Sequence, residues 1–214
     1  ENKFWWAARS FAAVVFFSIS ILSANVFITE IADPNNAAST GRFIELYNSG
    51  STDIDLSADG GWALQRWTNE NPEPTTSTNI IMDGSIPAGG FYIVGRAGFE
   101  ELYGFAPNQT GTGGPVDSNG DDQIALLDPS GNIIDMFGVP GEDGTGTAHE
   151  FEDGRAERAA GVTSGSATWV ATEWNIDNDG GAGDGAIDAP GGYDPGAWIG
   201  ATTQPTGTDV MFTV

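Results

Sequence analysis

The chain has 214 residues and a formal net charge of −23, because thirty aspartates and glutamates stand against only seven lysines and arginines. Such a surface repels nucleic acid and anionic lipid, so a function that depends on binding polyphosphates is excluded. The sequence contains no cysteine, so disulfides, thiolate metal sites and cysteine nucleophiles are also excluded. One domain with long loops and a substantial core is expected at this length.

The first 24 residues differ from the rest of the chain. Lys3 and Arg9 precede an apolar run at residues 11–24, and two small residues end that run. This order is typical of a secretory signal peptide, and the run is too short to span a bilayer. The alternative is a retained apolar helix that anchors the chain or forms the core of a filament. Both interpretations predict an extracellular or cell-surface protein.

Four short apolar runs follow, and each is bounded by Asn, Asp, Ser, Gly or Pro. They occupy residues 26–31, 43–47, 54–56 and 62–67. The second run, FIELY, alternates two kinds of side chain, which is the period of a strand with two different faces. Because turn residues fill the gaps, the whole stretch predicts successive antiparallel strands.

Two acidic residues lie inside these predicted strands. Glu30 and Glu45 are surrounded by β-branched or aromatic neighbours, and we expect them to face solvent or to end a strand. The alternative is that both point into one end of the domain and hold a cation together with Asp33.

Later apolar runs predict the remaining elements. Strands are expected at residues 79–82, 91–94, 124–127, 133–137 and 169–174, and one or two helical turns at 98–103. The pair 124–127 and 133–137 flanks a turn with Pro and Gly, which predicts a β-hairpin. The five later tryptophans occupy strand-like positions and are expected in the core: Trp62, Trp67, Trp169, Trp174 and Trp198.

Several of these segments together resemble a known family. The pieces are FITEIADP (27–34), RFIELYNSG (42–50), IDLS (54–57) and GWALQRW (61–67), and residues 86–95, 122–135, 154–158 and 169–174 fit the same pattern. They are similar to the bacterial lamin-tail domain, and the resemblance extends from about residue 26 to 200. It implies an immunoglobulin-like β-sandwich in an extracellular setting. It implies no reaction, because such domains act as structural or binding modules.

The predicted fold class is therefore all-β, an immunoglobulin-like sandwich of the lamin-tail type preceded by an apolar helical segment. The expected division is a leader or retained helix at 1–24, the sandwich at 25–200, and a linker with a terminal strand at 201–214. The resemblance also implies that Arg155 and Arg158 are structural, which agrees with pairing to an acidic surface.

Clustered carboxylates suggest calcium sites in two loops. Residues 175–180 (NIDNDG) imitate the first half of an EF-hand loop, but the twelfth position is Ala186, so another acid must replace the usual bidentate glutamate. The first candidate set is Asn175, Asp177, Asp179, Asp184 and Asp188. The second set is Asp117, Asn119, Asp121 and Asp122. The alternative for each is a solvated, turn-rich loop.

Catalytic motifs are lacking. The single histidine, His149, lies in an acidic loop and is expected to be exposed. The sequence contains no G-x-S-x-G, H-E-x-x-H or phosphate-binding loop. Thirty acids guarantee some carboxylate pairs, so such pairs are no signal of glycoside hydrolysis. We expect a protein without catalytic residues.

The function expected from the sequence is an exported, structural or adhesive cell-surface module stabilised by calcium. Its expected partners are other protein subunits or surface components, with membrane contact only through residues 1–24. One alternative is a filament subunit, a homopolymer assembled through residues 1–24, through the terminal strand at 209–214, or through both. A second alternative is an accessory module of a secreted hydrolase.

Overall fold

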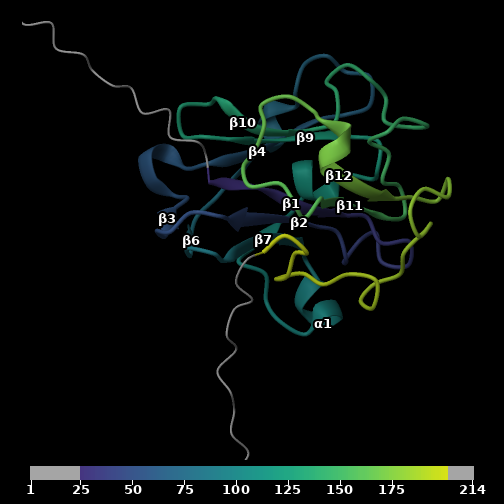
Figure 1. The fold of residues 1–214 in the computed structure, drawn as a ribbon, viewed down its shortest axis with the longest axis horizontal. Coiled ribbons are helices and arrows are strands. Elements are labelled where there is room, and N and C mark those ends of the chain that lie inside the picture. The colour runs from purple at the N-terminus through teal and green to yellow at the C-terminus, as the bar shows by residue number, and fades with distance from the viewer. Residues whose placement is uncertain (1–24, 202–214) are drawn as a thin grey trace, which may run out of the picture.

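The computed structural model describes residues 25–201. The leader or apolar helix expected at 1–24 and the terminal strand expected at 209–214 lie outside the described residues. Within 25–201 the chain forms a β-sandwich of a six-stranded and a four-stranded sheet, with a small two-stranded ribbon at one end (Figure 1). No helix in this part of the chain has the length and apolarity needed to cross a membrane.

The six-stranded sheet has the order β12-β11-β1-β2-β7-β8, and all neighbours are antiparallel except β7 and β8. Its strands are β1 (Val26–Ala32), β2 (Phe43–Asn48), β7 (Phe91–Arg96), β8 (Gln109–Gly111), β11 (Arg155–Arg158) and β12 (Trp174–Asp177). The four-stranded sheet contains β10 (Ile133–Phe137), β9 (Gln123–Leu127), β4 (Ala63–Trp67) and β5 (Ile80–Ile81), in that order. The ribbon pairs β3 (Ile54–Asp55) with β6 (Ser85–Ile86), and α1 (Phe99–Tyr103) follows β7.

Most predicted elements are confirmed, with one shift near the end of the sheet. The hairpin of β9 and β10 and the short helix α1 form where they were expected. The strand expected at 169–174 is wrong in its position, because a 3-10 turn, η4 (Ala171–Glu173), occupies half of that segment. The Glu173 amide donates to the Val170 carbonyl at 3.0 Å and closes this turn, so β12 begins only at Trp174.

The main core lies between the two sheets, where one set of alternating side chains from each strand meets. Most of these side chains are aliphatic, and burying one of the larger of them contributes roughly 1.5–3 kcal/mol. The fully buried members include Ile28, Ile44, Leu46, Leu64, Ile124 and Leu126. Of the five tryptophans expected in the core, Trp174 is buried in it, and Trp62 and Trp169 are half-buried against it. Trp67 and Trp198 are also buried, but in separate clusters outside the main core.

A second layer covers the outer face of the six-stranded sheet. Residues 187–201, which we call the strap, run beneath that sheet beside α1, on the side away from β4 and β9 (Figure 1). Tyr193 packs on Phe43, and Trp198 packs on Tyr47. Both faces of β1 and β2 are therefore buried, as the burial of every residue in the two strands shows.

This second layer overturns the expectation for the two strand glutamates. Glu30 and Glu45 are only 2% and 0% exposed, so the prediction that they face solvent is wrong. They lie opposite one another on neighbouring strands, under the strap. Asp33 does not join them, because its carboxylate pairs with Arg42 at 2.6 Å.

An ion pair also joins the two sheets through the core. The Arg158 guanidinium of β11 bonds the Asp135 carboxylate of β10, and the two side chains are 1% and 0% exposed. Asp135 also accepts the amides of Ile28 at 2.8 Å and Ser166 at 3.0 Å. The guanidinium carbon lies 4.0 Å from the Trp174 ring centroid. Arg158 is thus a structural residue, as the sequence resemblance implied.

Candidate metal centre

Three loops converge at one end of the sandwich: the loop before β9, the loop between β10 and β11, and the loop after β12. Backbone hydrogen bonds fix them together. The Phe151 amide donates to the Gly120 carbonyl at 2.9 Å, and the Asp179 amide donates to the Glu152 carbonyl at 2.9 Å. Residues distant in sequence are thereby held side by side.

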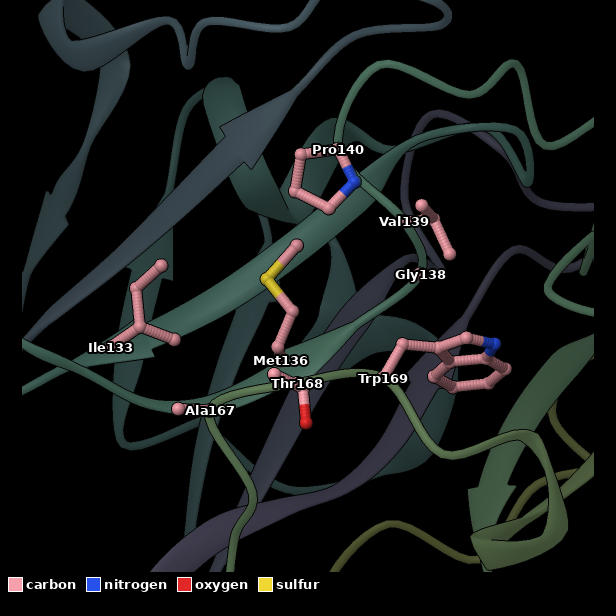
Figure 2. Close-up of a pocket in the computed structure, with 8 residues that line it drawn as sticks. All are labelled: Ile133, Met136, Gly138, Val139, Pro140, Ala167, Thr168 and Trp169. Carbon is pink, nitrogen blue, oxygen red and sulfur yellow. The ribbon is translucent and has the colours of Figure 1, made fainter.

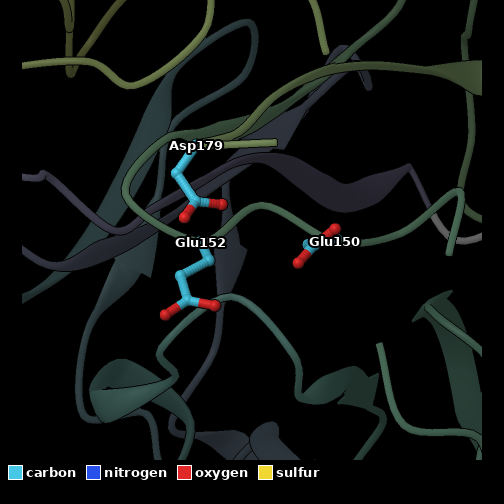
Figure 3. A group of neighbouring side chains, drawn as sticks. All are labelled: Glu150, Glu152 and Asp179. Atoms are coloured by element: carbon cyan, nitrogen blue, oxygen red, sulfur yellow. The ribbon is translucent and has the colours of Figure 1, made fainter. Parts of the chain in front are cut away.

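These loops bring three carboxylates together (Figure 3). Glu150, Glu152 and Asp179 each offer a carboxylate oxygen, and these oxygens lie within 4.8 Å of one another. The backbone alternates here: Phe151 enters the core with 0% exposure, while Glu150, which is 9% exposed, and the half-buried Glu152 stand on either side of it. Calcium binds oxygen ligands at about 2.3–2.6 Å, so one ion could contact all three groups. We call these residues the carboxylate trio.

The trio has no positively charged partner among the described residues. All five arginines in residues 25–201 are already paired with other acids. The pairs are Arg42 with Asp33 and Asp117, Arg66 with Asp122, Arg96 with Asp117, Arg155 with Asp177 and Asp194, and Arg158 with Asp135 and Glu173. Burial, followed by repulsion from Asp179, raises the pKa of Glu152. A cation between these groups would relieve that repulsion.

The loop that carries Asp179 is held in shape by Asn178. Its side chain is 5% exposed and donates to the Glu150 carbonyl at 3.1 Å. Its amide oxygen accepts the Ala182 amide at 3.0 Å. The Glu150 carboxylate in turn accepts the Gly146 amide at 2.9 Å. These bonds fix the Glu150 carboxylate and the backbone next to Asp179.

Only one member of the first predicted set reaches the trio, and that member is Asp179. Asn175 lies exposed on β12, while the Asp177 carboxylate accepts Arg155 at 3.0 Å and the Asp184 amide at 2.8 Å. Asp188 accepts the Asn35 amide group at 3.1 Å. The five residues are not brought together, because the first half of the segment is the regular strand β12 rather than a curling loop.

The second predicted set is also dispersed. Asp117 and Asp122 are ion-paired with arginines, and Asn119 is exposed. Asp121 accepts the Asn69 amide group at 2.6 Å, and its other carboxylate oxygen is buried without a hydrogen-bond partner among the described residues. Burial and nearby acids raise its pKa, and it adds to the repulsion felt by Glu152. Asp121 therefore borders the trio.

Glu150 and Glu152 were not among the predicted ligands. Their signal was the tripeptide Glu-Phe-Glu in an acidic loop, where one buried aromatic forces two carboxylates to the same side. The neighbouring His149 was expected to be exposed, which is wrong, because the side chain is 1% exposed. Burial lowers its pKa, and its Nδ1 lies 3.0 Å from the Thr147 hydroxyl.

A separate apolar pocket of about 320 Å³ opens beside β10 (Figure 2). Its lining residues are Ile133, Met136, Gly138, Val139, Pro140, Ala167, Thr168 and Trp169. None of them is charged. The Trp169 ring forms one wall and is held by Phe137, whose ring centroid is 4.9 Å away. The pocket has the size and chemistry to receive an apolar side chain rather than a charged ligand.

Comparison with known proteins identifies the family. No match was found among curated proteins. The family model of the Lamin Tail Domain matches residues 21–141, which is more than half of the chain. The matched residues include strands β1 to β10, whereas β11, β12 and the strap lie beyond the match. The β-sandwich described above agrees with the immunoglobulin-like fold of this family, and the chain is a member of the lamin tail domain family.

Proposed function

We propose that this protein is an exported, non-enzymatic structural or adhesive module of the cell surface, whose acidic loops are held together by calcium. The carboxylate trio carries this proposal, because two loops present three acids to one point without a basic partner among the described residues. Calcium suits an irregular loop site better than magnesium, since magnesium demands near-ideal octahedral geometry.

Two further observations support the structural and exported parts of the proposal. Lamin-tail domains are immunoglobulin-like and generally non-catalytic, which favours a scaffold or binding role over an enzyme. The composition of residues 1–24, in which Lys3 and Arg9 precede an apolar run, favours export.

The adhesive part of the proposal rests on the apolar pocket. A partner that inserts one apolar side chain beside Trp169 would gain burial at a site with no charge to desolvate. Because the net charge of the chain is −23, a partner with basic residues around that side chain would be favoured. Partners of this kind are protein subunits or other surface components.

Thermal unfolding with calcium and with excess chelator tests the proposal. A ligand bound only by the native state at a concentration of 100 Kd stabilises it by about 2.7 kcal/mol. For a domain of this size that energy corresponds to a Tm increase of roughly 5–10 °C. We expect this shift in the natural chain and its loss in the triple variant E150Q/E152Q/D179N.

A matched control removes the same charge from elsewhere. Asp59, Glu100 and Glu101 are exposed and lie outside the trio, so D59N/E100Q/E101Q should keep the calcium-dependent shift. In chelator the trio variant should melt above the natural chain, because repulsion between its carboxylates is gone. The proposal would be contradicted if the Tm of the natural chain were the same with calcium and with chelator. It would also be contradicted if calcium raised the Tm of the natural chain, the trio variant and the control variant by the same amount.

A further inference from the structure

A row of glutamates crosses the outer face of the six-stranded sheet. Glu30 of β1 lies opposite Glu157 of β11 on one side and opposite Glu45 of β2 on the other. Directly opposed residues of antiparallel strands point to the same face, so the three carboxylates are neighbours. Their side chains are buried, with 2%, 7% and 0% exposure for Glu30, Glu157 and Glu45.

The strap covers this row. The Gly196 amide donates to one Glu45 oxygen at 2.6 Å, and the Thr29 hydroxyl donates to the other at 2.7 Å. The backbone of Ile199 lies beside the Glu157 carboxylate. Trp198 anchors the strap further along, with its ring centroid 5.5 Å from that of Phe27. The row is thus sealed between sheet and strap.

The charges around Glu30 do not balance. One of its carboxylate oxygens is buried and has no hydrogen-bond partner among residues 25–201. The titratable groups that face it are Glu45, Glu157, Asp194, Arg155, Tyr103 and Tyr193. Arg155 is the only cation in this set, and its guanidinium already pairs with Asp177 at 3.0 Å. Burying several ionised carboxylates around one shared arginine is strongly unfavourable.

A bound metal ion is less suited than a proton to neutralise the buried negative charge of this row. Among the described residues, only the carboxylate trio brings three such oxygens within 4.8 Å of one another, so the glutamate row does not form a chelating cluster. Protons neutralise carboxylates without needing converging ligands. We propose that the opposed pair Glu30 and Glu45 holds one proton beneath the strap, and that loss of this proton, which leaves two buried carboxylates facing one another, releases the strap, so that the row acts as a pH-sensitive latch.

The direction of the latch follows from the two environments. Burial raises the pKa of Glu45 from 4.5 to about 8 and outweighs the opposite effect of the hydrogen bonds from Gly196 and Thr29. Burial followed by repulsion from Glu45 raises the pKa of Glu30 well above 4.5. Opening the strap would return both groups to water and to ordinary pKa values. The closed form therefore binds protons more tightly and is favoured at low pH. Between the ordinary and the raised pKa, the opening constant should increase about tenfold per pH unit for each proton.

Release would change the surface that the protein presents. The strap covers aromatic side chains of the outer sheet face, among them Phe27, Phe43 and Tyr47. These side chains would become accessible as the pH rises, which would create an apolar contact surface. The latch involves no member of the carboxylate trio, so it stands or fails independently of calcium binding.

Hydrogen exchange of the strap tests the latch on the full chain. The Gly196 amide reports directly, because it donates to Glu45 in the closed form. We expect its opening constant, after correction for intrinsic exchange rates, to increase about fiftyfold between pH 6 and pH 8 for one proton, because the slope of about tenfold per unit flattens as the raised pKa of about 8 is reached. In the double variant E30Q/E45Q this dependence should disappear, while E100Q/E101Q, which changes two exposed acids, should retain it.

Infrared spectroscopy of the natural chain tests the protonation itself and does not depend on how the variant folds. We expect absorption from protonated carboxyl groups at pH 6 that decreases as pH 8 is approached, in step with strap exchange. Subtracting the spectrum of E30Q/E45Q from that of the natural chain should assign this absorption to Glu30 and Glu45. An unchanged opening constant between pH 6 and pH 8 overturns the proposal, and so does the lack of any protonated carboxyl absorption at pH 6.

Discussion

Asp135→Asn should destabilise this domain severely, because it removes the charge that balances a buried arginine. Asp135 and Arg158 are 0% and 1% exposed, so neither can turn to water. After the substitution, the Arg158 guanidinium keeps only the Glu173 carboxylate, at 3.1 Å and 31% exposed, as an acidic partner. Removing one member of such a buried pair costs about 3–5 kcal/mol. That cost corresponds to a Tm decrease of roughly 6–20 °C.

Urea unfolding measures this cost directly. Arg96→Gln is the matched control, since Arg96 pairs with Asp117 at the surface with 22% and 41% exposure and should cost less than about 1 kcal/mol. The double variant D135N/R158M should recover part of the lost stability, because it leaves no buried charge without a partner. A cost for D135N as small as that of the control would refute the view that this pair joins the two sheets.

Two further variants test the core and the loops. Leu126→Ala should cost about 2–5 kcal/mol in urea unfolding, because Leu126 is 0% exposed between the sheets; a cost equal to that of Ile81→Ala, at a side chain 49% exposed, would place the core elsewhere. Gly120→Ala should abolish the calcium-dependent Tm shift, because Gly120 has a φ of +102° and a Cβ there would overlap the backbone of Glu152. A full calcium shift in that variant would show that the loop contact does not position the trio.

The central strands could be predicted from sequence because their signals are local. Residues 43–47 alternate with period two, and turn residues bound each neighbouring run. The burial of Glu30 and Glu45 could not be predicted in this way. It depends on the strap, which lies about 150 residues later in the chain and covers a face that would otherwise meet water. A strand pattern shows two faces but not what covers each of them.

The candidate metal centre was only partly accessible to sequence reasoning for a similar reason. The motif around Asp179 was visible, but it was assigned ligands from its own loop. Asp177 instead neutralises Arg155, and β12 extends through half of the motif. The actual neighbours, Glu150 and Glu152, come from a loop more than 25 residues upstream, and the sheet pairing of β11 with β12 and the hydrogen bonds between the two loops bring them near.

The most direct test of the proposed function is a calorimetric titration of calcium into the metal-free chain, in parallel with E150Q/E152Q/D179N. We expect one saturable site per chain in the natural protein and no such site in the triple variant. The absence of calcium binding in the natural chain would contradict the claim that calcium holds these loops. Undiminished binding in the triple variant would contradict its assignment to Glu150, Glu152 and Asp179.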